Sequence, residues 1–358
     1  MTGGRPVETD AGMAVAAPDQ PVEGALLHWL EERVAGFAGP ARLHKFKGGQ
    51  SNPTYRLDAA SGSYVLRRQP PGKLLKSAHA VDREYRVMRA LAGTGVPVPR
   101  MLALCADRGV VGSLFFVMEH CDGRIFWDAA LPDIASPGER AAIYDDMNRV
   151  LAALHSVDPA AVGLADYGKP GNYFARQLSR WVGQYRASEL ETIPAMEELM
   201  AWLEAQQPAD DGRVALVHGD YRHDNMIFHP EEPRIVAVLD WELSTLGHPL
   251  ADLAYQCMQL RMPGGKGFSP GLAGLNRTAL GIPEESEYVA RYCERTGLDG
   301  IDNWPFCLAF SFFRLAAIVQ GVAKRAVDGN ASNTRAAELG RWVEPLAKMA
   351  LQVIADGR

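Results

Sequence analysis

The sequence contains few cysteines and no pattern that would pair them or bind zinc. There are five cysteines in 358 residues, they are widely separated, and no C-x-x-C pair occurs. An odd number of scattered cysteines predicts reduced thiols rather than a disulfide framework or a zinc site. We therefore expect a cytoplasmic protein whose cysteines are free.

Runs of basic residues are also absent. Lys and Arg together number 37 against 43 Asp and Glu, which gives a net charge of −6. Proteins that bind nucleic acids present clustered positive charge to the phosphates. A nucleic-acid partner is therefore not expected.

No uninterrupted apolar run matches a membrane-spanning helix. The most apolar stretch, 304–322, is broken by Ser311, Arg314 and Gln320, which are costly at the centre of a bilayer. We expect a buried helix there and no membrane association. Residues 1–20 lack the basic flank and the apolar core of a signal peptide, and we interpret them as a disordered tail.

Several motifs of nucleotide-binding and hydrolytic enzymes are missing as well. The sequence has no G-x-x-x-x-G-K-[ST] loop and no G-x-S-x-G nucleophile segment, which excludes the P-loop and α/β-hydrolase patterns. The histidines His223, His229 and His248 lack the H-E-x-x-H spacing of a zinc enzyme. A metal-dependent hydrolase built on them remains an alternative, and it predicts zinc in the protein and no dependence on ATP.

The composition is that of a globular protein, with 47% hydrophobic, 22% charged and 8% aromatic residues. The length predicts about two domains or lobes. Between residues 43 and 117, short β-type runs at 54–57, 63–66 and 113–117 flank one helix expected at about 79–91. After Gly123 the pattern becomes helical.

Two short apolar runs in the helical half lead directly into polar clusters. The run 214–217 precedes the segment from His218 to Asn225, and the run 235–239 precedes Asp240. Carboxylate and amide oxygens at strand ends are suitable ligands for Mg²⁺, and a further carboxylate is available to accept a proton. This set of groups is what phosphoryl transfer requires.

The order of these polar residues resembles a known active site. The segment H-G-D-x-x-x-x-N at 218–225 resembles the catalytic loop of the kinase-like superfamily, and L-D-W-E at 239–242 resembles its metal-binding segment. The resemblance implies that Asp220 accepts the proton of the substrate hydroxyl. It also implies that Asn225 and Asp240 bind Mg²⁺.

The same resemblance implies roles for three further residues. Arg222 is implied to be a catalytic cation that faces the phosphate, and His218 is implied to brace the loop. Asp252, in the segment 247–254, corresponds to the family's aspartate that supports the catalytic loop from a helix.

The resemblance also assigns nucleotide binding to the N-terminal half. A kinase-like small lobe needs a phosphate-covering loop, a strand cation paired with a helix carboxylate, and a hinge whose backbone contacts adenine. The strand cation is an arginine where protein kinases have lysine, and the adjacent Arg68 competes for the role. The implied nucleotide-binding residues are Gly48, Gly49, Ser51 and Asn52 of the loop, Arg67 of the strand, Glu84 of the helix, and Met118, Glu119 and Cys121 of the hinge.

Taken together, the motifs resemble most closely the phosphotransferases related to aminoglycoside and choline kinases. The segments 65–74 and 79–85 resemble the branch found fused to acyl-CoA dehydrogenases in animals. The resemblance implies an α+β fold of the two-lobed, protein-kinase-like type. Residues 21–122 would form a small antiparallel β lobe with one helix, and residues 123–358 a larger, mainly helical lobe.

The implied function is transfer of a phosphoryl group from Mg-ATP to a hydroxyl of a small molecule. The fused branch points to a hydroxyacyl-CoA or a related hydroxy acid as the acceptor. An aminoglycoside- or choline-type kinase is an alternative, although the C-terminal segment has no acidic run that would bind a polycationic drug. A nucleotide-binding pseudokinase that acts as a sensor is another.

Overall fold

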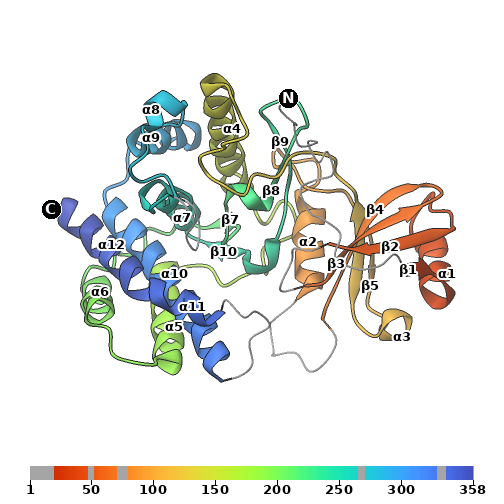
Figure 1. Ribbon diagram of the computed structural model, residues 1–358, viewed down its shortest axis with the longest axis horizontal. Helices are drawn as coiled ribbons and strands as arrows, with labels where there is room; N and C mark the ends of the chain where they lie inside the picture. The colour runs from red at the N-terminus through yellow and green to blue at the C-terminus, as the bar shows by residue number, and fades with distance from the viewer. Residues whose placement is uncertain (1–19, 47–51, 71–79, 265–270, 329–335, 358) are drawn as a thin grey trace, which may run out of the picture. The chain divides into compact units, whose positions relative to one another are not determined.

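The computed structural model describes residues 20–46, 52–70, 80–264, 271–328 and 336–357 (Figure 1). The chain divides into two compact units. Unit 1 comprises Met1–Trp127, Ala160–Leu164 and Arg222–Ser244, and unit 2 comprises Asp128–Pro159, Ala165–Tyr221 and Thr245–Arg358. The predicted lobes changed at residue 122. In the structure the first boundary follows Trp127, and Ala160–Leu164 and Arg222–Ser244 also belong to the N-terminal unit.

Unit 1 is built on a six-stranded antiparallel sheet with the order β1-β2-β3-β4-β6-β5. The expected runs at 54–57, 63–66 and 113–117 correspond to β3, β4 and β6, whereas the sequence patterns did not identify the other three strands. The strands are β1 (Gln20–Val22), β2 (Ala41–Lys45), β3 (Thr54–Ala59), β4 (Gly62–Arg68), β5 (Met101–Cys105) and β6 (Phe115–Glu119).

Two helices pack against opposite faces of this sheet (Figure 1). Side chains alternate between the faces of a strand, and Leu66 and Val117 join the apolar cluster that contains Leu30 of α1 (Gly24–Arg33). The opposite face meets α2 (Val81–Leu91), where the rings of Tyr85 and Phe116 lie 6.1 Å apart. Adjacent residues of β4 therefore have different surroundings, with α1 on one side and α2 on the other.

The segment Arg222–Ser244 belongs to unit 1 because its hairpin is hydrogen-bonded to the chain just before β5 and just after β6. The main chains of Arg124 and Phe228 exchange two hydrogen bonds of 2.8 Å, and the Val238 N–H donates to the Pro97 carbonyl at 2.9 Å. The segment consists of η1 (His223–Asn225), β8 (Met226–Phe228), β9 (Ile235–Val238) and η2 (Trp241–Leu243).

Unit 2 is mainly helical. Its first helix begins after Ser136, whose side chain accepts a hydrogen bond from the Glu139 N–H. A small antiparallel pair of strands lies within the unit. The elements of unit 2 are α4 (Pro137–His155), α5 (Tyr173–Ser188), α6 (Pro194–Ala205), β7 (Ala215–Val217), β10 (Thr245–Gly247), α7 (Leu250–Arg261), α8 (Arg277–Leu280), α9 (Glu285–Thr296), α10 (Trp304–Val327), α11 (Ala336–Leu339), η3 (Gly340–Trp342) and α12 (Val343–Asp356).

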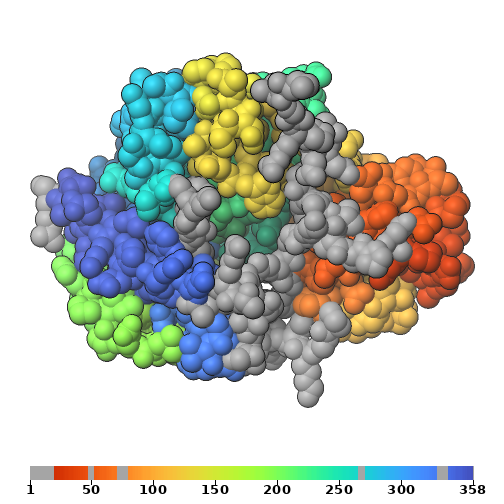
Figure 2. Space-filling view, viewed as in Figure 1, coloured from red at the N-terminus to blue at the C-terminus, as the bar shows by residue number. Residues whose placement is uncertain are grey.

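The core of unit 2 is organised around α10. This helix is long and apolar enough to cross a membrane, but 83% of its most apolar window is buried within the protein. It packs against α5, α7 and α12, and α12, in dark blue, lies at the surface of the unit (Figure 2). The expectation of a buried helix at 304–322 is met, and all five cysteines have free thiols.

Candidate functional site

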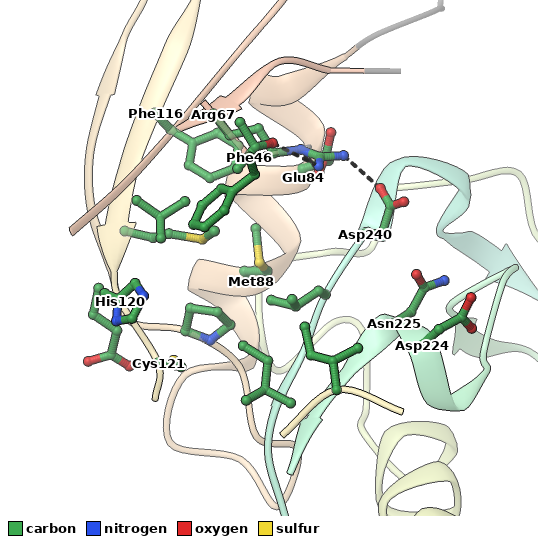
Figure 3. Close-up of a pocket in the computed structure, with 18 of the residues that line it drawn as sticks. Phe46, Arg67, Glu84, Met88, Phe116, His120, Cys121, Asp224, Asn225 and Asp240 are labelled. Carbon is green, nitrogen blue, oxygen red and sulfur yellow. Dashed lines mark hydrogen bonds and ion pairs between the residues drawn. The ribbon is translucent and has the colours of Figure 1, made fainter. Parts of the chain in front are cut away.

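A pocket in unit 1 collects most of the nucleotide-binding residues predicted from the sequence (Figure 3). Its walls come from the α2-facing side of the sheet, from α2, from the hinge segment Glu119–Gly123 and from residues 224–240. Most of the lining is apolar, and the charged groups are Arg67, Glu84, Glu119, Asp224 and Asp240. The other lining residues are Phe46, Thr54, Val65, Met88, Pro99, Phe116, Met118, His120, Cys121, Ile125, Trp127, Asn225, Ile227 and Leu239.

Arg67 and Glu84 form a buried ion pair within this pocket. The Arg67 Nε atom lies 2.9 Å from Glu84 Oε2, and the two residues are 9% and 1% exposed. Burial raises the pKa of Glu84 to about 7, although the charge of Arg67 opposes that rise. Burial alone would lower the pKa of Arg67, but the charges of Glu84 and Asp240 outweigh it and raise that pKa.

The structure distinguishes Arg67 from its neighbour Arg68. The side chains of consecutive strand residues point to opposite faces, and Arg67 lies on the face that meets α2. Arg68 is paired in the sheet with Phe115, whose side chain belongs to the α1-facing cluster. The cation in the pocket is therefore Arg67.

Asp240 lies beside Arg67 from a different part of the chain. The Arg67 Nη2 atom donates to Asp240 Oδ1 at 2.6 Å, which Figure 3 shows as a dashed line. Asp240 has a φ of 63°, a left-handed conformation that aspartate adopts more readily than most residues. The next residue, Trp241, is fully buried and its indole N–H donates to the Val238 carbonyl at 2.9 Å, so the turn that directs the Asp240 carboxylate is anchored.

Asn225 and Asp240 come together because they lie at one end of the same hairpin. Asn225 immediately precedes β8, and Asp240 is the second residue after the end of β9, while Met226 pairs with Val238. The Leu239 N–H donates to the Asn225 carbonyl at 2.8 Å. Both side chains line the pocket, so an amide oxygen and a carboxylate are available together for a hard cation.

The three residues predicted to form the hinge lie at the pocket. Met118, Glu119 and Cys121 all line the pocket, and the Glu119 N–H donates to the Arg100 carbonyl at 3.0 Å. Within the described ranges, the Cys121 N–H has no backbone acceptor. Burial, with the nearby charge of Glu119, raises the pKa of the Cys121 thiol to about 12, so this side chain is a neutral part of the pocket wall.

The predicted phosphate loop is described only at its end. Gly48, Gly49 and Ser51 lie outside the described residues. Asn52 is fully buried, and its Nδ2 donates to Glu84 Oε1 at 2.8 Å. Its side chain therefore supports the Glu84 carboxylate, while the nucleotide-binding role predicted for Asn52 concerned the backbone N–H groups of the loop.

Arg222 also has a partner that the sequence did not indicate. Its guanidinium makes two hydrogen bonds to the Asp224 carboxylate, through Nε to Oδ1 and through Nη2 to Oδ2. Asp224 lines the pocket, whereas Arg222 is not among the lining residues. The positive charge expected at a phosphate is thus neutralised within the loop in this conformation.

A buried carboxylate of unit 2 holds the start of the segment that was predicted to be the catalytic loop. Asp252 Oδ2 accepts the His218 N–H at 2.6 Å, and Oδ1 accepts the Gly219 N–H at 2.8 Å. Burial would raise the pKa of Asp252, but hydrogen bonds and charges, chiefly those of His155, lower it overall. Asp252 therefore remains ionised as a brace, in agreement with its implied role, and Asp220 follows directly after the braced residues.

The sequence motifs did not identify one residue that contacts the segment containing Gly219. Arg314 of α10 donates from Nη2 to the Gly219 carbonyl at 2.6 Å. The sequence signal was an arginine inside the most apolar stretch of the chain, which we had used only to argue against a membrane span. The zinc alternative gains no support, because the described part of the chain has no group of three or more His, Cys, Asp or Glu placed to hold a metal.

Comparison with known proteins identifies the class. The model of the phosphotransferase enzyme family named APH matches residues 42–293, well over half of the chain. The chain therefore belongs to this phosphotransferase family.

Its relatives include multidomain proteins. Mouse acyl-CoA dehydrogenase family member 10 is 50% identical over 87% of this chain and 29% of its own length. Rat acyl-CoA dehydrogenase family member 11 is 44% identical over 91% of this chain and 42% of its own length. The chain thus spans less than half the length of these relatives, and the predicted likeness to the branch associated with acyl-CoA dehydrogenases is confirmed.

Solved structures confirm the fold class. A Ralstonia eutropha protein described as an aminoglycoside phosphotransferase superposes with a TM-score of 0.85 at 52% identity, over 93% of this chain and 98% of that one. A spectinomycin phosphotransferase crystallised with ADP and spectinomycin gives a TM-score of 0.61 at 14% identity, over 94% of this chain and 99% of that one. The protein has the kinase-like aminoglycoside phosphotransferase fold.

Proposed function

We propose that this protein transfers the γ-phosphoryl group of Mg-ATP to a hydroxyl group of a small molecule. The observation that carries the proposal is the gathering of Arg67, Glu84, Asn225 and Asp240 in one pocket of unit 1. Phosphoryl transfer depends mainly on positioning and on neutralising phosphate charge. A cation, its supporting carboxylate and two oxygen ligands for a metal supply those requirements.

The apolar part of the pocket fits the base of the nucleotide. The whole pocket has a volume of about 190 Å³, below the roughly 300–1,000 Å³ of sites that enclose a complete ligand. We therefore place only the adenine there, between Val65 and Met118 of the sheet and Leu239 of the hairpin, with its polar edge toward the Cys121 N–H. The phosphates then extend toward Arg67.

The oxygen donors fit a magnesium ion. Asn225 and Asp240 would hold Mg²⁺, which when bound offsets the charge of the phosphates. The Asp240 carboxylate is 35% exposed and remains accessible to a cation, while Arg67 stays paired with the buried Glu84 and presents its outer nitrogens to phosphate oxygens. Asp220 accepts the proton of the acceptor hydroxyl.

We propose a hydroxyacyl-CoA or a related hydroxy acid as the acceptor. The support is the relationship to acyl-CoA dehydrogenase family members, in which a phosphotransferase-like segment accompanies further sequence. Aminoglycosides and choline are the competing acceptors, since spectinomycin is bound by a protein of the same fold.

The proposal is tested by combining nucleotide binding with turnover. Mg-ATP should raise the melting temperature of the wild type, and of Asp220→Asn to a similar extent. ADP release should require one of the hydroxyacyl-CoAs, hydroxy acids, choline or aminoglycosides, and should fall by at least about 1,000-fold in Asp220→Asn. Asp299→Asn, at an exposed position of unit 2, is the matched control.

Three results would count against the proposal. Absence of any melting shift with Mg-ATP would exclude the nucleotide site. A shift without transfer to any acceptor would favour a pseudokinase sensor. Normal turnover by Asp220→Asn would remove this residue from the role of base.

A further inference from the structure

Helix α10 places an arginine inside unit 2, next to the segment that contains Asp220. Arg314 is 7% exposed, and its Nη2 atom donates to the Gly219 carbonyl at 2.6 Å. A buried guanidinium is costly unless its charge and its hydrogen bonds are satisfied. A residue of this kind in an apolar helix therefore needs a specific interaction to offset its cost.

Aromatic rings hold the guanidinium in a fixed place. The Arg314 Cζ atom lies 5.7 Å from the centroid of the Trp181 ring and 5.4 Å from that of Tyr255. Cation–π attraction at these distances compensates part of the lost hydration. No carboxylate of the described residues forms an ion pair with Arg314 within 4.0 Å, so its directed contact is with the backbone of Gly219.

This contact completes the restraint on both peptide groups of Gly219. The Gly219 N–H is already held by Asp252 at 2.8 Å. Its carbonyl belongs to the same planar peptide group as the Asp220 N–H, which donates to His218 Nδ1 at 3.2 Å. Gly219 has a φ of 85°, and because glycine tolerates many backbone conformations, this peptide group would rotate more freely without the hydrogen bond from Arg314.

We infer that Arg314 is a positioning residue for Asp220, acting through the peptide group that joins Gly219 to Asp220. The inference rests on the proposed function, because it assumes that Asp220 is the base. Asp252 accepts a hydrogen bond from the Gly219 N–H, and Arg314 donates one to the Gly219 carbonyl. Helix α10 thereby contributes to the placement of the base through a residue 94 positions later in the sequence.

The first test removes the charge from Arg314 and measures turnover. Arg314→Gln should lower kcat by about 100-fold, because small displacements of a catalytic group have effects of that size. The KM for ATP should stay within about 2-fold of wild type. Arg314→Lys keeps a cationic donor and should recover part of kcat, and Arg325→Gln, at an exposed position of the same helix, should behave as wild type.

The second test does not depend on any acceptor. Hydrogen exchange of the free protein should be faster at the Asp220 amide in Arg314→Gln than in wild type, with α10 and α7 unchanged. Unchanged exchange at Asp220 would overturn the inference, as would equal loss of protection throughout unit 2 in both the Gln and the Lys variants. If the wild type transfers phosphate to no acceptor, the proposed function fails, while the exchange experiment still decides whether Arg314 holds the loop.

Discussion

The buried carboxyl of Glu84 should make the stability of unit 1 depend on pH, and Glu84→Gln should remove that dependence. Burial raises the pKa of Glu84 to about 7 from an ordinary value of 4.5. Each unit of pKa difference between the folded and unfolded states corresponds to about 1.4 kcal/mol. The difference for Glu84 therefore corresponds to about 3 kcal/mol in the free energy of unfolding.

The sign follows from which state binds the proton more tightly. The folded protein holds the Glu84 proton to a higher pH than the unfolded chain does, so the stabilisation is complete below about pH 4.5 and is lost as the pH rises through about 7. A glutamine cannot titrate. The free energy of unfolding of wild type minus that of Glu84→Gln should therefore fall by about 3 kcal/mol over this window.

Urea unfolding of both proteins from about pH 4.5 to about pH 8 measures this difference directly. Glu204→Gln, at an exposed position of α6, is the matched control and should follow wild type at every pH. A difference between wild type and Glu84→Gln that stays flat across the window would refute the reasoning. It would mean that the attraction of Arg67 outweighs burial and keeps Glu84 ionised throughout.

Two further predictions concern the support of the site. Asp252→Asn should lower the free energy of unfolding by about 2–4 kcal/mol, because the two backbone N–H groups that donate hydrogen bonds to Asp252 lose a charged acceptor. An unchanged midpoint of urea unfolding would contradict this prediction. Gly123→Ala would place a Cβ atom 2.2 Å from the Phe228 carbonyl oxygen and should cost at least about 2 kcal/mol. Gly300→Ala, which meets nothing within 4 Å, should change stability by less than about 0.5 kcal/mol, and similar thermal unfolding of the two alanine variants would exclude the close approach at Gly123.

The order of residues within short segments of the sequence was sufficient to predict part of the site. Asn225 and Asp240 are separated by one hairpin, formed by β8 and β9. The order of polar residues in the two motifs indicated both side chains, although the apolar run 214–217 became β7 of unit 2 and is not part of this hairpin. The start of α4 was equally local, because Ser136 caps a helix whose first residues follow it directly. Motif spacing within one segment determines these placements, since few chain conformations connect residues so close together.

The contacts that complete the site depend on tertiary structure. Arg67 and Arg68 are chemically identical neighbours, and only the strand register decides which one meets Glu84. Asn52 supports that same carboxylate from 32 residues away.

The hydrogen bond from Arg314 to Gly219 joins residues 95 positions apart in the sequence. The chemical type of a side chain limits which groups it can bind. The sequence alone determined the side-chain types at the site and the family to which the protein belongs. Which of the eligible partners lies within hydrogen-bond distance is decided by the packing of helices and strands that are far apart in the chain.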